Sequence, residues 1–589
     1  MYQFQNSLAK LPLPPLDKTC QRYLQMLAPL LSEAELARTK AAVINFLQGS
    51  GLQLQRQLEM IHDSTSTSYV HELIVDSYFD YRLPLPIYKN PASLASQVLD
   101  ISKLPLARVV AIIISNMLRF YLKIKRRELE PDRELFQANR QPLCMIQYDN
   151  LFGTSKVPGF KRDTLQHSRN PEHVVVIHRN VFYSLHLLKE EEMATVEQIE
   201  QQLDWILENT PPGEPAVGAL TGLPRTKWAA VRSHLAALDP ENARSLDLVE
   251  GAIFVVCLDE TIPTDLEAAA RNVLHGDGCN RWFDKSIQIV FTPDGRFGIN
   301  MEHTGFDGYP LMRLISEVNR DLQGEMSAPT PAVKCAPPMQ LRWTLTQELL
   351  EEIEQVSATM ARLIRQFELR VLEFNEFGSA FIQQHGLIAD AVVQLAIQLT
   401  YVRLHGKVGC VSETVHTRNF QYGRFENTRP VTLQSLALIR AFSEATSDEE
   451  RYSALKRAVF AHLKLLYDCK QGNCVDRHLL ALQALARYQG VEPDIFQDKA
   501  YAEVFLKPAI STSSLGGDMG IQLICFGTTV HPGISDSYGI SDSYGICYLI
   551  GCESIVFGVS SKYQQIDEFI QLLKQSLLEL GELMARMGM

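Results

Sequence analysis

Residues 275–308 read HGDGCNRWFDKSIQIVFTPDGRFGINMEHTGFDG, and this stretch decides both the fold class and the chemistry. Two apolar runs in it flank Pro293-Asp294-Gly295, a sequence typical of a tight turn. We therefore predict a β-hairpin over residues 286–303. His303 ends the second strand of that hairpin, and Asp307 follows four positions later, just before a glycine.

His303 is a candidate general base. A neutral imidazole can take a proton from a hydroxyl within hydrogen-bonding reach, as acyl transfer to an alcohol requires. Asp307 can hold the local backbone through a salt bridge, so that the imidazole points into a site. An HxxxD pattern also arises by chance in a chain of 589 residues, and a purely structural histidine is the alternative interpretation.

The bulk composition narrows the class of protein. The chain has 589 residues, a net charge of -12 and eleven cysteines. Its length predicts about two domains, and its acidic balance argues against a nucleic-acid partner. The cysteines lack metal-binding spacing, which indicates free thiols and predicts a cytoplasmic protein. We expect no signal peptide, and the most apolar stretch, Val109–Ser115, is too short for a membrane span.

The hydrophobic pattern predicts alternating helices and strands, and hence an α/β chain. Ser32 and Glu35 form a capping-box pattern at a helix start, and the proline-rich residues 82–91 are expected to be a hinge or linker. Helices are expected at 16–62, 92–130, 194–208, 226–238, 345–374, 387–404, 450–466 and 564–586. Strands are expected at 173–188 and 252–260, in the hairpin, and at 510–517, 521–527, 546–551 and 554–561.

Four prolines within residues 326–343 mark the domain boundary that we expect. The predicted division is an N-terminal helical segment, 1–88, that packs with the second domain, a first α/β domain, 89–343, that carries His303, and a second α/β domain, 344–589. The hexapeptide ISDSYG occurs twice in succession, from Ile534 to Gly545. We interpret it as a local duplication that lengthens a loop.

Several motifs resemble, in order, those of the choline/carnitine acyltransferases. They are the NRWFDKS run at 280–286 beside His303, LPLPPLDKTCQRYLQMLAPLLSEAE (11–35), LCMIQYDNLFGTSKVPGFKRDT (143–164), SETVHTRNFQYGR (412–424), VDRHLLAL (475–482) and ISTSS (510–514). This resemblance implies two chloramphenicol-acetyltransferase-like α/β domains with an active-site tunnel between them. It also implies direct O-acyl transfer from a thioester to a small alcohol by a monomer without a bound metal or prosthetic group.

The resemblance assigns roles to individual residues. His303 becomes the general base, and Asp307 is expected to pair with Arg418. Ser511 and Ser513 correspond to a Ser-Thr-Ser motif whose second serine helps to stabilise the tetrahedral oxyanion.

In the family that the chain resembles, the residue two positions before a Phe-Gly pair limits the length of the acyl chain. The pair here is Phe526-Gly527, and the bulky residue before it is Ile524, so the resemblance implies a short acyl chain.

The acceptor side departs from the carnitine enzymes, which hold the carnitine carboxylate with a Tyr, a Thr and an Arg. By the resemblance, these positions are Ser412, Phe425 and Asn473. Without those groups a buried carboxylate would lose its counter-charge, so we expect an alcohol other than carnitine. Phe425 can offer its face to a cation or simply fill the pocket. Choline or another amino alcohol, acetylated from coenzyme A, is the alternative.

The donor side departs as well. Two lysines that help the family to hold coenzyme A appear as Ser379 and Gln383, while Asp390 is retained. Each charge-assisted hydrogen bond contributes about 1.5–3 kcal/mol, so we expect weakened coenzyme A binding. An acyl carrier protein, which presents phosphopantetheine without the nucleotide, is then an expected donor beside acyl-CoA. A basic cluster is either its docking site or a solvated helix end: Lys123, Lys125, Arg126 and Arg127.

An alternative hypothesis of a different class is that the protein is a catalytically inactive relative of these enzymes that only binds a ligand. A decayed enzyme has no need for a base, its orienting ion pair and an oxyanion donor together. The presence of His303, Asp307, Arg418 and the ISTSS motif therefore argues against it.

Overall fold

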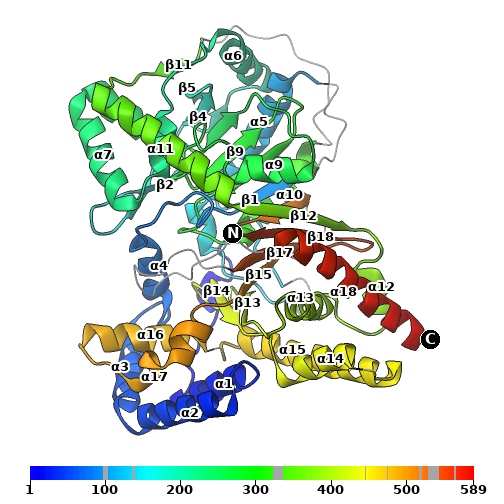
Figure 1. Cartoon of the computed structure of the whole chain (residues 1–589). Coiled ribbons are helices and arrows are strands. Elements are labelled where there is room, and N and C mark those ends of the chain that lie inside the picture. The colour runs from blue at the N-terminus through cyan, green and yellow to red at the C-terminus, as the bar shows by residue number, and fades with distance from the viewer. Residues whose placement is uncertain are drawn as a thin grey trace.

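The computed structural model describes residues 1–96, 104–134, 140–322, 336–444, 446–473, 475–515, 520–527, 543–562 and 565–588. Two large mixed sheets, each with helices packed on it, make the chain an α/β protein, as predicted (Figure 1). The first copy of ISDSYG and the start of the second lie outside the described residues, as does most of the proline-rich boundary segment.

The first sheet has eight strands in the order β11-β5-β4-β8-β9-β10-β1-β16. The predicted hairpin is confirmed, because β9 and β10 pair antiparallel across the Pro293-Asp294-Gly295 turn. The strands are β1 Ala92–Ala95, β4 His173–His178, β5 Val181–His186, β8 Val255–Leu258, β9 Ile287–Phe291, β10 Phe297–Met301, β11 Met339–Leu341 and β16 Ile521–Cys525.

Alternate side chains of each strand point to opposite faces of this sheet. Helices cover both faces. Val174 and Val176 of β4 belong to one core, while Val175 and Ile177 belong to the other. The first core is covered by α5 Leu106–Lys125, α6 Val196–Asn209 and α10 Gly308–Leu322. The second is covered by α7 Arg225–Leu238, α8 Pro240–Gly251, α9 Leu266–Leu274 and α11 Gln347–Gln366.

The NRWFDKS run at the start of the hairpin forms buried polar contacts with the segment after β8 and with helix α7. Arg281 forms a buried ion pair with Asp259 at 2.7 Å. Asp284 accepts hydrogen bonds from Nη1 of Arg225 at 2.5 Å and from Nε1 of Trp228 at 2.6 Å. These contacts give the run a structural role, because each buried charge in it has a partner.

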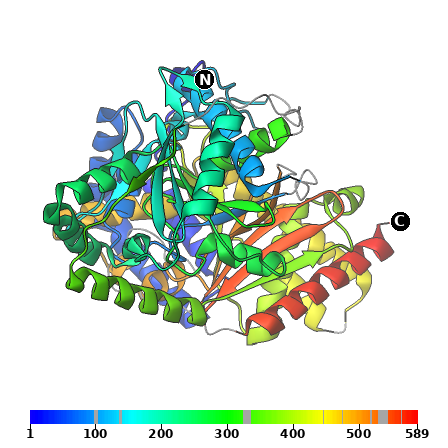
Figure 2. The same cartoon turned by 90° about the horizontal axis from the view of Figure 1, so that it is seen from above.

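The second sheet has the order β12-β18-β17-β15-β13-β14. Its strands are β12 Glu368–Phe374, β13 Val411–His416, β14 Phe425–Thr428, β15 Ile510–Ser514, β17 Tyr544–Ile550 and β18 Ile555–Ser561. One face packs against α12 Ser379–Gln384, α13 Ala389–His405, α14 Leu433–Ser443, α15 Asp448–Lys470 and α18 Ile566–Met587 (Figures 1 and 2). The other face turns toward the first sheet.

The two sheets meet at β16. This strand comes from the second half of the sequence, yet it pairs with β1 at the edge of the first sheet. Gly558 of β18 lies so close to it that a Cβ there would stand 2.7 Å from the carbonyl oxygen of Ile524. Because β16 and α11 both belong with the first sheet, the two halves of the chain interlock. The division at residue 343 stays a prediction.

The N-terminal helices α1 Leu16–Leu27, α2 Glu33–Gln48 and α3 Ser50–Ser64 pack against α16 Asp476–Tyr488 and α17 Asp494–Gln497. The capping box of Ser32 and Glu35 is confirmed. A further helix, α4 His71–Phe79, leads from them toward the first sheet (Figure 1). The short elements are η1 Gln5–Ser7, η3 Ile146–Asn150, β2 Thr154–Val157, β3 Thr164–His167, β6 Leu188–Lys189, β7 Glu192–Met193, η4 Val217–Gly222 and η5 Ala500–Phe505.

Four expectations from the sequence are corrected. Residues 92–95 form β1 rather than helix, and the helix predicted over 345–374 ends at Gln366 and continues as β12. Residues 82–91, predicted to be a hinge or linker, include fully buried side chains, such as that of Leu85, and are therefore packed rather than free as a linker would be. Cys469 is disulfide-bonded, although Cys20, Cys144, Cys257, Cys279, Cys410, Cys525, Cys547 and Cys552 are free.

Candidate active site

His303 lies just after β10, where it meets one side chain from α4 and one from β14. Its Nδ1 lies 2.9 Å from the hydroxyl oxygen of Tyr78, and the two rings stack with centroids 5.7 Å apart at 17°. Phe425 meets the imidazole edge-on at 6.3 Å and 89°. The His303 side chain keeps 23% of its surface exposed, so it is not sealed in the core.

The surroundings keep His303 neutral. Burial lowers the pKa of His303 to about 4, and the nearby cations Arg424 and Lys89 lower it further, while Asp307 opposes them. At pH 7 the imidazole therefore carries an unprotonated nitrogen, which is the state that a general base requires.

Asp307 pairs with Arg424, and the predicted partner Arg418 is wrong. Nη2 of Arg424 lies 2.7 Å from Oδ1 of Asp307 and donates to the carbonyl oxygen of His303 at 2.9 Å. Nη1 of Arg424 donates to the carbonyl oxygen of Thr304. Asp307 Oδ1 is 3.9 Å from His303 Nδ1, too far for a hydrogen bond. The ion pair thus holds the backbone of the turn at residues 302–307 (the catalytic turn), and Asp307 acts on the imidazole through this backbone and through its charge, without a hydrogen bond.

Arg418 serves a different purpose. It pairs with the buried Asp132 and donates through Nε and Nη2 to the carbonyl oxygen of Cys144, at 3.1 and 2.9 Å. Its guanidinium also lies 4.6 Å from the ring centroid of Tyr309. These contacts tie the second half of the chain to the first, and they place Arg418 outside the catalytic ion pair.

Lys156 braces α4 against the catalytic turn. Its Nζ donates to the carbonyl oxygen of Tyr78 at 2.9 Å and to Oγ1 of Thr304 at 3.2 Å, and it pairs with Glu302 at 3.5 Å. The side chains of Lys156 and Glu302 are 1% and 3% exposed. The position of the Tyr78 hydroxyl therefore depends on a buried ion pair.

Ser511 and Ser513 lie on β15, on the side of the second sheet that faces the first. Thr512 points the other way, because its Oγ1 accepts a hydrogen bond from Gln394 of α13 at 2.8 Å. Ser513 stands in register with Cys547, which packs in a core of the first sheet. Because alternate side chains of a strand point to opposite faces, Ser511 and Ser513 both turn toward the interface between the sheets.

Ile524 and Phe526 also lie at this interface. Ile524 is 6% exposed and packs in the same core as Phe306 of the catalytic turn. The side chain of Phe526 packs against that core. A bulky side chain thus occupies the place that the sequence assigns to the acyl channel.

The acceptor side contains a cation, contrary to expectation. The guanidinium of Arg477, which is 4% exposed, lies 4.5 Å from the ring centroid of Phe425. Its Nε donates to the carbonyl oxygen of Phe425 at 3.2 Å, whereas its buried Nη2 has no partner among the described residues. Asn473 lies four positions earlier, in the turn after α15, and its backbone N–H bonds to Asp468. The cation is therefore supplied by Arg477.

Two carboxyl groups, those of Glu426 and Asp476, lie close enough to Arg477 to interact with its charge. Burial raises the pKa of Glu426 to about 8, so this carboxyl is mostly protonated at pH 7. Asp476 is paired with Arg429 at 2.9 Å. Ser412 is fully buried and accepts from Nη1 of Arg429 at 3.2 Å.

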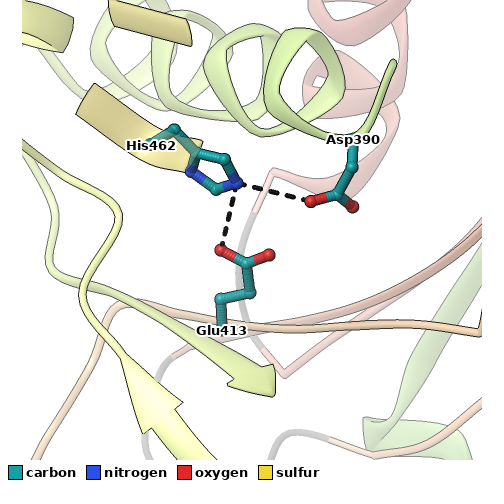
Figure 3. Close-up of side chains that lie close together, drawn as sticks. All are labelled: Asp390, Glu413 and His462. Atoms are coloured by element: carbon teal, nitrogen blue, oxygen red, sulfur yellow. Dashed lines mark hydrogen bonds and ion pairs between the residues drawn. The ribbon is translucent and has the colours of Figure 1, made fainter. Parts of the chain in front are cut away.

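The three donor-side residues differ in their surroundings. Ser379 donates to the carbonyl oxygen of Gly551 at 3.0 Å, and Gln383 is exposed. Asp390 turns inward, where its Oδ1 accepts from the Tyr548 hydroxyl at 2.7 Å and its Oδ2 lies 3.3 Å from Nε2 of His462. Figure 3 shows Asp390, Glu413 and His462 converging on one point.

With this geometry in place, comparison with known proteins is informative. The family model for choline/carnitine O-acyltransferases matches residues 11–575. The chain belongs to this family. It is 30% identical to choline O-acetyltransferase of Danio rerio, over 98% of this chain and 93% of that protein. It is also 30% identical to carnitine O-acetyltransferase of Mus musculus, over 91% and 87%, and 29% identical to peroxisomal carnitine O-octanoyltransferase of Bos taurus, over 89% and 87%.

Membership of the choline/carnitine O-acyltransferase family makes the chain an enzyme that moves acyl groups to alcohol oxygens. Family members take the acyl group from acyl-CoA as a co-substrate. In the part of the chain that the structure describes, no helix has the length and apolar character to cross a membrane.

Three of the four cations at the end of α5 have carboxylate partners. Lys123 pairs with Glu317 at 3.0 Å, and Lys125 and Arg126 both pair with Glu191, at 3.4 and 2.8 Å. Because Lys125 and Arg126 share one carboxylate, the cluster is only partly neutralised.

The structure brings together some of the predicted site residues and adds others. His303, Asp307 and Phe425 meet, as the motifs predict, whereas Arg418 and Asn473 lie apart from them. Sequence reasoning missed Tyr78, Arg424 and Arg477. Arg424 and Arg477 stand within the quoted motifs SETVHTRNFQYGR and VDRHLLAL, but Tyr78 is 225 positions from His303 and no local pattern marks it.

Proposed function

We propose that this enzyme transfers a short acyl group from a thioester directly to the hydroxyl of a small alcohol, with Nε2 of His303 as the general base. The observation that carries this proposal is the contact between Nδ1 of His303 and the Tyr78 hydroxyl. If Nδ1–H donates to Tyr78, the lone pair of a neutral ring stands on Nε2. Burial raises the pKa of Tyr78 to about 12, so the phenol stays neutral, and in the proposed tautomer its oxygen accepts this bond.

The chemistry follows from that tautomer. Nε2 takes the hydroxyl proton while the alcohol oxygen attacks the thioester carbonyl, and a tetrahedral oxyanion forms. Ser513 is proposed to donate a hydrogen bond to this oxyanion. The oxyanion then collapses to the ester, the carbon–sulfur bond breaks, and the leaving thiolate takes the proton back from Nε2. The Asp307–Arg424 pair keeps the imidazole oriented throughout.

For the acceptor, we propose a small alcohol that carries a carboxylate. A buried guanidinium with an unpartnered N–H favours an anion beside it, and Arg477 has such an Nη2. A purely cationic alcohol such as choline would leave this N–H without an acceptor and would place its charge beside that of Arg477. Ser412 and Phe425 still give fewer hydrogen bonds than the carnitine enzymes have, which is why we keep an alcohol other than carnitine as the proposed acceptor.

For the donor, we propose an acyl carrier protein, with acyl-CoA as the alternative. Because most of the cations on α5 are held in ion pairs, we place the docking surface on the outer face of α15. It exposes Phe460 by 71% and Tyr467 by 65% beside Lys456, Arg457 and Lys464, cations that have no ion-pair partner among the described residues. An acidic carrier complements such a face. The same helix carries His462, which contacts the donor residue Asp390.

We also propose that the enzyme is a cytoplasmic monomer. The free thiols support a reducing compartment, whereas the bonded Cys469 does not. Cell fractionation and light scattering test the two statements.

The test of the function is a panel of substrates. Acetyl-CoA and acetyl carrier protein are each offered with carnitine, choline and small hydroxy acids, and esters are followed by mass spectrometry. We expect ester formation with a hydroxy acid, faster from the carrier, and a loss of about 10²–10⁴-fold in kcat for His303→Ala.

His234→Ala, which removes an exposed histidine on α7, is the matched control and should retain activity. An active His303→Ala variant would overturn the assignment of the base. Lack of turnover with every donor would favour an inactive binding relative, and a preference for choline would contradict the carboxylate.

A further inference from the structure

A second cluster of chemically active side chains lies on the face of β13 opposite to Ser412. Asp390 comes from the first turn of α13, Glu413 from β13 and His462 from α15 (Figure 3). Their ligand atoms all lie within 4.8 Å of one another. Nε2 of His462 is 3.3 Å from Oδ2 of Asp390 and 3.7 Å from Oε2 of Glu413.

The cluster places two carboxyl groups beside one imidazole. The side chains of Glu413 and His462 are 7% and 2% exposed, and two carboxylates so close together repel each other in a buried place. No lysine or arginine within the described ranges pairs with either carboxylate. Oε2 of Glu413 is buried and has no hydrogen-bond partner there, although it points at the imidazole.

The arrangement suits a metal ion in geometry as well. Zinc–ligand bonds of about 2.0–2.2 Å place tetrahedral ligand atoms roughly 3.3–3.6 Å apart. The two measured separations from Nε2 are close to this range, so small rotations of the side chains would close the site. An imidazole with two carboxylates, and an open position for water, is a donor set that zinc accepts.

Neighbouring groups fix the orientation of one ligand. The Tyr548 hydroxyl donates to Oδ1 of Asp390 at 2.7 Å, and Nε2 of Gln394 donates to the Tyr548 oxygen at 3.0 Å. These two hydrogen bonds leave Oδ2 of Asp390 directed at the cluster centre, as hydrogen bonds to ligating carboxylates do in metal sites. Asp390 is 28% exposed, which gives an ion a path in from solvent.

We propose that Asp390, Glu413 and His462 form a binding site for a divalent transition-metal ion of the zinc type. The site lies behind the strand that carries Ser412, and Glu413 stands in register with Thr512 of the ISTSS strand. The ion would hold α13, α15 and β13 together on the donor side. This inference does not depend on the proposed reaction, because binding is measured without acyl donor or acceptor.

The experiment uses the full chain after removal of metals with a chelator. Calorimetric titration with Zn²⁺, and separately with Mn²⁺, should give about one site per chain and a raised melting temperature. Glu413→Gln removes a ligand charge at almost constant shape and should weaken Zn²⁺ binding at least about tenfold. X-ray absorption should show nitrogen and oxygen ligands at about 2.0–2.2 Å, with histidine scattering.

The matched control is Glu373→Gln, which alters an exposed carboxylate on β12 of the same sheet and should bind Zn²⁺ as the wild type does. His462→Gln is a second ligand variant, in case Glu413→Gln fails to fold. The absence of a binding heat and a thermal shift with both ions in the wild type would overturn the proposal. So would Zn²⁺ binding that both ligand variants leave unchanged.

Discussion

At the scale of single residues, the reactivity of His303 depends on its neighbours. Burial keeps the ring neutral, and Arg424 holds the backbone on both sides of it. The Tyr78 hydroxyl contacts Nδ1, and in the proposed tautomer it accepts the Nδ1 proton and leaves Nε2 free to act as the base. A tyrosine thus does the orienting that an aspartate does in many histidine-based sites.

Tyr78→Phe tests this role. Loss of one hydrogen bond should lower kcat about tenfold with little change in KM, since the free energy of such a bond is about 0.5–1.5 kcal/mol. Because the lowered pKa of His303 comes mainly from burial, kcat/KM of both enzymes should stay flat from pH 7 to 5 and fall only as the pH approaches about 4. Tyr81→Phe, whose hydroxyl bonds to the Pro84 carbonyl, is the control.

Two results would contradict this role. An unchanged kcat in Tyr78→Phe would mean that another group orients the imidazole. An acidic fall centred near the ordinary histidine pKa of about 6.5 would mean that His303 is solvated in the working enzyme.

At the scale of elements, α4 and the catalytic turn behave as one unit. Helix α4 supplies Tyr78, and Lys156 of β2 ties the backbone of that helix to the turn through Thr304 and Glu302. The position of Tyr78 relative to His303 is therefore set by a contact between elements that are far apart in the sequence.

Lys156→Met should destabilise the fold and lower kcat together. It leaves Glu302 buried without its partner, which costs about 3–5 kcal/mol. The double variant Lys156→Met/Glu302→Gln removes both charges and should recover much of the stability but not the activity. Urea unfolding and initial rates measure the two effects. Equal recovery of both would show that Lys156 only stabilises the fold.

At the scale of the whole molecule, the two substrates are expected to approach from different surfaces. We place the acceptor beside Phe425, Arg477 and His303, whereas the proposed carrier would dock on the outer face of α15. The net charge of -12 disfavours an acidic partner in general, so a local cationic face has to overcome a repulsive background.

The surface variant Phe460→Ala/Lys464→Glu should lower kcat/KM for the acyl carrier protein about tenfold or more, by loss of an exposed aromatic and reversal of a charge. The kcat/KM for acyl-CoA should change little. The control Lys123→Glu alters the paired cluster on α5 and should affect neither donor. An equal effect of the α15 variant on both donors would place the nucleotide, rather than the carrier, on this face.

The sequence by itself determined those local elements whose signals lie close together, and it marked His303 as the candidate base. The hairpin, the capping box and the alternation of β15 depend on neighbours only a few positions apart, where residue periodicity and turn chemistry are sufficient. His303 stands at the end of that hairpin for the same reason.

Only the tertiary structure decided which residues act on His303. Arg424 rather than Arg418 reaches Asp307, Tyr78 meets the imidazole from another element, and Arg477 supplies the cation beside Phe425. Residues 92–95 and 368–374 become strands because partners far along the chain, β10 and β18, offer them hydrogen bonds. Such contacts come from packing between distant segments, which periodicity along the chain does not encode.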